Sequence, residues 1–157
     1  MEIEPFQEKI IKQLIDQETM LSKLYTLFSE QFPECQKFWK NLSKAEERHA
    51  KLIEKLLEAA KKGIVFFDEG KMKSYTLAAF LTRLESIVQK AQRCEYSLTS
   101  AFVCAMDYES SLIEKNVFTH FDSLGEKAKT TLKILQSETI DHVEHIRNAQ
   151  KKILKTK

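Results

Sequence analysis

The sequence predicts an all-α protein: a four-helix bundle in which a long crossover, itself carrying a short helix, joins the second and third helices. The 157 residues are expected to form a single domain, 1–157, because a chain of this length builds one core. Only three glycines and two prolines interrupt the chain, so its long uninterrupted stretches are typical of helices. Within them, apolar residues recur every three or four positions, which is the period of one helix face.

The first two helices are predicted over residues 6–30 and 34–61. Pro33 separates them and suits the first turn of the second helix, where its missing N–H is not needed. A short connection produces an antiparallel hairpin, so we expect the two helices to lie side by side. Their inward stripes comprise Ile11, Leu14, Glu18, Leu21, Tyr25 and Phe28 in the first helix, and Phe38, Leu42, Glu46, His49, Ile53 and Leu56 in the second.

The last two helices are predicted over residues 96–118 and 124–154 and form a second hairpin. Ser123 and Glu126 have the spacing of a capping box at the start of the final helix. The inward stripes comprise Leu98, Phe102, Ala105, Glu109 and Leu112 in the third helix, and Leu135, Glu138, His142, His145 and Ala149 in the fourth.

The connection between the hairpins is long enough to carry the chain to the opposite end of the bundle. It contains a predicted helix over residues 75–92, with apolar residues at helical spacing. The apolar run at residues 64–67 has the composition of a short strand, but we expect this connection to pack along the outside of the bundle. The order of short, long and short connections excludes a simple up-down-up-down bundle.

Charge and composition argue against a nucleic-acid-binding protein, a membrane protein and a disulfide-rich protein. Lysine and arginine exceed the acidic residues by only two, which gives no field for nucleic acid or an anionic membrane. No apolar run approaches the roughly 20 residues of a membrane span, and the acidic stretch from Met1 to Pro5 is unlike a signal peptide. Cys35, Cys94 and Cys104 are odd in number and form no Cys-x-x-Cys pair, which argues against a disulfide framework or a zinc ribbon. We expect a cytoplasmic protein.

Each of the four inward stripes carries a glutamate near its middle: Glu18, Glu46, Glu109 and Glu138. Ionised carboxylates in a dry core repel one another, and each costs several kcal/mol to desolvate unless it is paired. The stripes contain no lysine or arginine to balance them. Each glutamate lies about 13 to 15 residues from the turn of its hairpin, so all four stand at one height in the bundle. A bound cation is therefore the expected counter-ion.

The second helix offers a nitrogen ligand beside its glutamate. His49 follows Glu46 by three residues, the spacing by which one helix presents an oxygen and an imidazole to one metal. Glu47 points away from the stripe and is expected to be solvated. Tyr25 and Tyr108 lie near enough to the glutamates to donate a hydrogen bond beside the site, although simple packing is the ordinary role of such residues.

The fourth helix leaves a choice of ligand. Asp141 lies three residues after Glu138, whereas His142 lies four after it and still falls on the apolar stripe. We therefore favour His142 and keep Asp141 as its rival. His145, two turns beyond Glu138, is expected to be a core residue or to support a ligand.

These residues together resemble the di-iron domain of the rubrerythrins, in the ferritin-like superfamily. The resemblance covers nearly the whole chain and implies a ferritin-like bundle that holds two iron ions. Carboxylate and imidazole ligands also suit manganese and do not exclude zinc. By this resemblance, Glu18, Glu46 and His49 would bind one iron and Glu109, Glu138 and His142 the other, with Glu46 and Glu138 as the bridging candidates.

The resemblance implies an oxidoreductase that acts on peroxide or dioxygen, and it suggests a homodimer. Two features depart from full rubrerythrins. There are no Cys-x-x-Cys pairs of a rubredoxin domain, so electrons would come from an external donor protein. Leu112 stands where full rubrerythrins carry a further glutamate, and Glu114 points elsewhere on the helix. The alternatives are a metal-binding or iron-sensing module without turnover, and a purely structural helical bundle.

Overall fold

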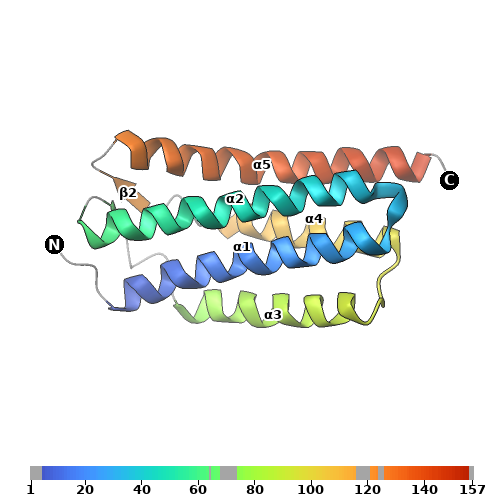
Figure 1. Cartoon of the computed structure of the whole chain (residues 1–157), viewed down its shortest axis with the longest axis horizontal. Helices are drawn as coiled ribbons and strands as arrows, with labels where there is room; N and C mark the ends of the chain where they lie inside the picture. The colour runs from blue at the N-terminus through green and yellow to red at the C-terminus, as the bar shows by residue number, and fades with distance from the viewer. Residues whose placement is uncertain (1–4, 64, 68–73, 116–120, 124–125, 156–157) are drawn as a thin grey trace.

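The computed structural model describes residues 5–63, 65–67, 74–115, 121–123 and 126–155 (Figure 1). The predicted all-α class is confirmed: helices make up almost all of this part of the chain. In order, the elements are α1 (Pro5–Gln31), the 3-10 turn η1 (Pro33–Cys35), α2 (Gln36–Lys61), β1 (Val65–Phe67), α3 (Ser74–Gln92), α4 (Leu98–Lys115), β2 (Phe121–Ser123) and α5 (Glu126–Lys155).

The chain order gives the predicted crossover. Helices α1 and α2 form one antiparallel hairpin, and α4 and α5 form the other (Figure 1). Between them, α3 lies alongside α1 and carries the chain back along the bundle, so that α4 begins at the end opposite to the one where α2 stops. The crossover thus delivers the chain to the far end, which makes α2 and α4 parallel as in a ferritin-like bundle.

One local expectation is wrong, and a second falls partly outside the described residues. Residues 65–67 do not simply pack along the bundle but form β1, which pairs antiparallel with β2; Ile64 lies outside the described residues. Pairing with β2 satisfies backbone groups that a bare connection would leave to solvent. The predicted capping box from Ser123 to Glu126 includes residues 124 and 125, which lie outside the described residues.

The apolar core is divided into two clusters by a polar layer. One cluster gathers the aromatic side chains toward the α1–α2 turn, among them Phe28, Trp39 and Phe102. The other lies toward the opposite end and includes Ile11 and Leu56. The acids and histidines of the inward stripes fall between the two clusters in sequence on α1, α2 and α5. No helix in the described part of the chain is long and apolar enough to cross a membrane.

Candidate metal centre

The structure brings all six predicted ligand residues into the polar layer between the two apolar clusters. Each has a nitrogen or carboxylate oxygen within 4.0 Å of another member of the set. Five of the side chains are buried, with no more than 6% of their surface exposed. The exception is Glu138, whose side chain is 28% exposed. The six residues are Glu18 on α1, Glu46 and His49 on α2, Glu109 on α4, and Glu138 and His142 on α5.

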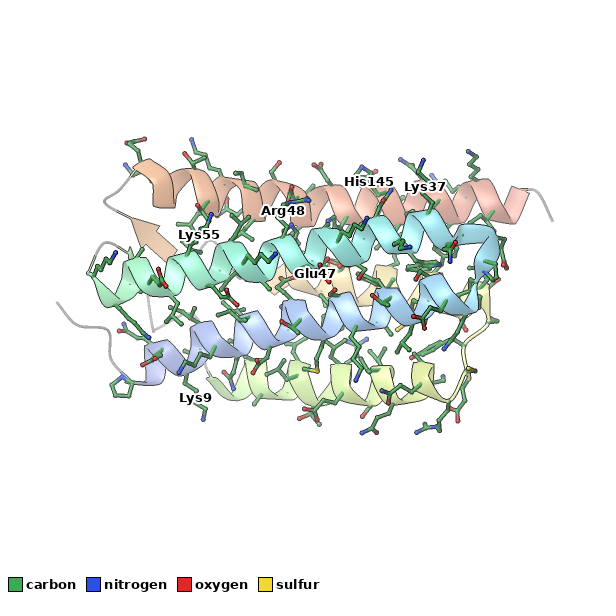
Figure 2. The ribbon with its side chains drawn as sticks, in the orientation of Figure 1. Lys9, Lys37, Glu47, Arg48, Lys55 and His145 are labelled. Atoms are coloured by element: carbon green, nitrogen blue, oxygen red, sulfur yellow. The ribbon has the colours of Figure 1, made fainter. Side chains whose placement is uncertain are left out.

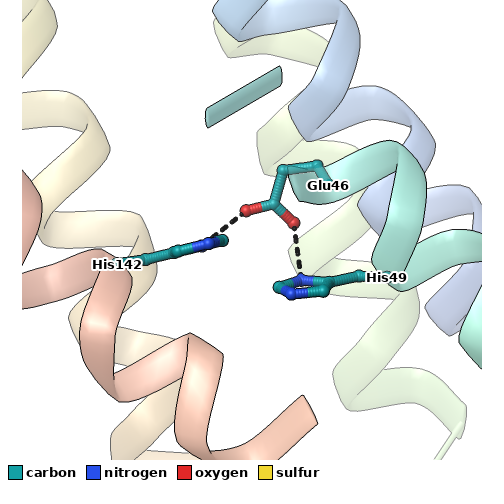
Figure 3. A group of neighbouring side chains, drawn as sticks. All are labelled: Glu46, His49 and His142. Atoms are coloured by element: carbon teal, nitrogen blue, oxygen red, sulfur yellow. Dashed lines mark ion pairs between the residues drawn. The ribbon is translucent and has the colours of Figure 1, made fainter. Parts of the chain in front are cut away.

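The Glu46 carboxylate lies between the two histidines (Figure 3). Its Oε1 is 2.9 Å from Nδ1 of His142, and its Oε2 is 3.4 Å from Nδ1 of His49. The two imidazole rings stack with centroids 5.0 Å apart and planes 19° apart. Ligand atoms of these three residues all lie within 4.8 Å of one another. One carboxylate from α2 thus joins imidazoles that come from the two hairpins.

Two further carboxylates lie on either side of this group. Glu18 Oε2 is 3.7 Å from His49 Nδ1, and Glu109 Oε1 is 3.8 Å from His142 Nδ1. Each Nδ1 therefore faces two carboxylates, Glu46 and one other. Tyr25 donates a hydrogen bond of 2.8 Å to Glu109 Oε1, which confirms the expected donor beside the site.

Glu138 closes the rim of the group. Its Oε2 lies 2.5 Å from Nε2 of His49, and its Oε1 accepts a 3.0 Å hydrogen bond from Nη2 of Arg48. Both carboxylate oxygens are therefore engaged by side chains of α2. In this arrangement the Glu138 carboxylate fixes the orientation of the His49 ring.

Burial and charge set the protonation of the group. Burial raises the pKa of Glu18 well above its usual range, and the Glu46 carboxylate raises it further. Burial and Glu109 also push the pKa of Glu46 upward, but the neighbouring Glu18 carboxyl and the two imidazoles outweigh them and lower it. Burial alone would lower the pKa of each histidine; the surrounding carboxylates instead raise it to about 11 for His49 and about 10 for His142. The metal-free centre therefore holds protons that a metal must displace.

Several buried atoms in the group lack a hydrogen-bond partner, which tests whether it fits a metal. They are Glu18 Oε2, Glu46 Oε1 and His142 Nδ1. Glu46 Oε1 and His142 Nδ1 are close but are not aligned as donor and acceptor. An unsatisfied buried polar atom costs about 1–3 kcal/mol, so these atoms need a common partner. Carboxylate oxygens and imidazole nitrogens from three helices are the ligand types that iron and manganese take, and the residues fit such an ion.

The rival residues on α5 lie elsewhere. Asp141 and His145 are exposed, whereas His142 is buried among the carboxylates. The expectation that His145 belongs to the core is wrong, because it stands on the same side of α5 as the half-exposed Glu138, at the edge of the buried stripe. Glu47 is exposed, as expected.

Two residues at the centre escaped sequence reasoning. Arg48 precedes His49 in the sequence, but nothing in the sequence of α2 indicates that Arg48 pairs with Glu138, ninety residues later. Gln17 is buried and accepts a 3.1 Å hydrogen bond from Tyr108. Tyr108 therefore contacts the neighbour of Glu18 instead of a glutamate of the site. A lone glutamine beside an acid carries no signal for this role.

Fold and site together define a four-helix-bundle protein with a carboxylate and histidine centre in its core. The family model for rubrerythrin matches residues 9–130, and the chain belongs to the rubrerythrin family. The match includes Glu18, Glu46, His49 and Glu109 but ends before the α5 residues of the site. Searches of curated proteins and of solved structures gave no match.

Proposed function

We propose that the protein is a non-haem di-iron oxidoreductase that reacts with peroxide or dioxygen. The proposed ligands are Glu18, Glu46, His49, Glu109, Glu138 and His142. Two iron ions held together supply two electrons to one oxidant molecule. Electrons return from a separate donor protein. The odd number of cysteines and the lack of a Cys-x-x-Cys pair support a cytoplasmic location.

The observation that carries the proposal is the position of Glu46 between two buried histidines. A carboxylate with one oxygen toward each imidazole would hold iron together with both rings. Glu18 and Glu109 flank the two rings and supply a further carboxylate to each. The Tyr25 hydroxyl, hydrogen-bonded to Glu109, holds that carboxylate and carries a proton next to the centre.

Burial of these side chains keeps the site dry. Apolar clusters on both sides of the polar layer keep bulk water from the ligand atoms, and a dry site strengthens every charge interaction in it. Protons that leave the histidines and Glu18 when a metal enters must pass to solvent, and the part-exposed Glu138 carboxylate, which contacts His49, offers them a path.

Metal content tests the first half of the proposal. Protein purified without chelators and reconstituted with iron should hold about two ions per chain. Glu46→Gln keeps the shape of the side chain but removes its charge, so it should lose most of this metal. Glu47→Gln is the matched control, because Glu47 is exposed one residue away. Native protein with less than about 0.2 ion per chain after reconstitution would leave only a structural bundle.

Turnover tests the second half. Leu112 in place of a glutamate favours a metal-binding or iron-sensing module as the second candidate function; its side chain lies outside the described residues. Ferrous protein mixed anaerobically with peroxide should become ferric and, with an added electron donor, should consume peroxide repeatedly. Oxidation without repeated consumption under any donor would establish the second candidate.

A further inference from the structure

A groove of about 470 Å³ runs along the seam between α2 and α5. It is lined by one stripe of each helix, with residues at spacings of three and four. Because the two helices are antiparallel (Figure 1), Arg48 near one end of its stripe lies opposite Glu138 at the start of the other. Figure 2 shows Arg48 and His145 along this seam. Its polar lining residues include Arg48, Glu138, Asp141, His145 and Asn148.

The groove reaches the metal centre at Glu138. Of the six proposed ligands, only Glu138 and His142 line the groove, and His142 is buried. Asp141 and His145, one turn apart on α5, place a carboxylate and an imidazole in the lining of the groove. The groove therefore presents cation ligands on its α5 wall, and the Glu138 carboxylate of the site lines one end of it.

An ion pair joins the two walls at one end of the groove. Arg48 Nη2 and Glu138 Oε1 are 3.0 Å apart, and the Arg48 side chain is 57% exposed. Because the pair is partly solvated, breaking it requires little free energy compared with a buried pair. The same carboxylate oxygen cannot be held by the guanidinium and used freely as a metal ligand. Arg48 and a metal ion thus compete for Glu138.

We propose that the groove is the route by which divalent cations reach the centre, and that Arg48 closes it by holding Glu138 until a metal displaces the guanidinium. The inference rests on the proposed function, since it takes Glu138 as a ligand. Arg48 is a positioning residue in this scheme. Its removal should strengthen metal binding, the opposite of what loss of a supporting residue would do.

Arg48→Ala tests the competition. Fe²⁺ is added anaerobically, uptake is followed by stopped flow, and release is followed with bipyridyl as the competing chelator. We expect faster uptake and an affinity higher by roughly three- to fivefold, the ratio that a partly solvated ion pair contributes. Arg48→Lys keeps the charge and loses the planar fork, so it should fall between the alanine variant and native protein. Arg147→Ala is the matched control, because Arg147 pairs with Glu144 on α5 and does not line the groove.

Asn148→Trp tests the route independently. A bulky ring at the groove should slow uptake and release together, by about tenfold, and leave the equilibrium affinity unchanged, since a barrier alters rates alone. Arg147→Trp, at the adjacent position outside the groove, should behave like native protein. Far-UV circular dichroism establishes that each variant keeps its helices.

The outcomes separate this inference from the proposed function. Native protein that takes up no iron refutes the proposed function, whatever the variants do. Native protein that binds iron while Arg48→Ala binds it equally well or more weakly refutes the competition. Unchanged rates in Asn148→Trp would show that cations arrive by another path.

Discussion

Metal binding to this centre should release protons and strengthen steeply as the pH rises. The carboxylates raise the pKa of His49 to about 11 and that of His142 to about 10. Both imidazoles are therefore protonated on both nitrogens and positively charged at pH 6 to 8. A metal that coordinates either Nδ1 needs the neutral ring. Filling the centre must therefore expel at least one proton from each histidine.

The size of the effect follows from these two values. At 1.36 kcal/mol per pH unit, deprotonation at pH 7 costs about 5 kcal/mol for His49 and about 4 kcal/mol for His142. Each released proton changes the overall binding constant by about tenfold per pH unit, so two protons give about a hundredfold. Glu18, whose pKa burial also raises, adds to the release in the same direction.

Isothermal titration calorimetry with Mn²⁺, in phosphate and in Tris at matched pH, measures the proton count. Buffers with different ionisation enthalpies separate the heat of proton release from the heat of binding. Affinities at pH 6, 7 and 8 then give the slope independently. Release of less than one proton per chain, or an affinity that does not change over this range, would refute the protonated histidines and the ligand arrangement built on them.

Three further predictions concern stability and ligand choice. The raised histidine pKa values stabilise the metal-free fold fully below pH 6.5, and this contribution is lost as the pH rises toward 10. The unfolding temperature of metal-free protein should therefore fall further below that of loaded protein at pH 8 than at pH 5. An equal difference at the two pH values would contradict this. Metal analysis of alanine variants should show that His142→Ala loses metal, whereas Asp141→Ala and His145→Ala largely retain it; equal content in all three would mean that the ligand assignment on α5 is wrong. Tyr25→Phe leaves buried Glu109 without its donor and should lower the free energy of unfolding of metal-free protein by about 1–3 kcal/mol in urea, with a loss under 0.5 kcal/mol contradicting a hydrogen bond that matters.

The sequence by itself determines which face of each helix turns inward. The direction of a side chain around its helix follows from the helix period alone. For this reason the sequence predicts that Glu18, Glu46, Glu109 and His142 point into one layer of the bundle. Hairpin symmetry also predicted their common height. The three-residue step from Glu46 to His49 likewise needs no tertiary information, since both residues share one helix face.

Only the tertiary structure decided what lies at the edges of those faces. Glu138 and His145 sit on the inward stripe of α5 by period, yet one is part-exposed and the other exposed, because α5 leaves an open seam beside α2. The pairing of Arg48 with Glu138 and of Tyr108 with Gln17 joins residues that are distant along the chain. Which side chains meet across a seam depends on the separation and rotation of two packed helices, and neither quantity is present in the pattern of one helix alone.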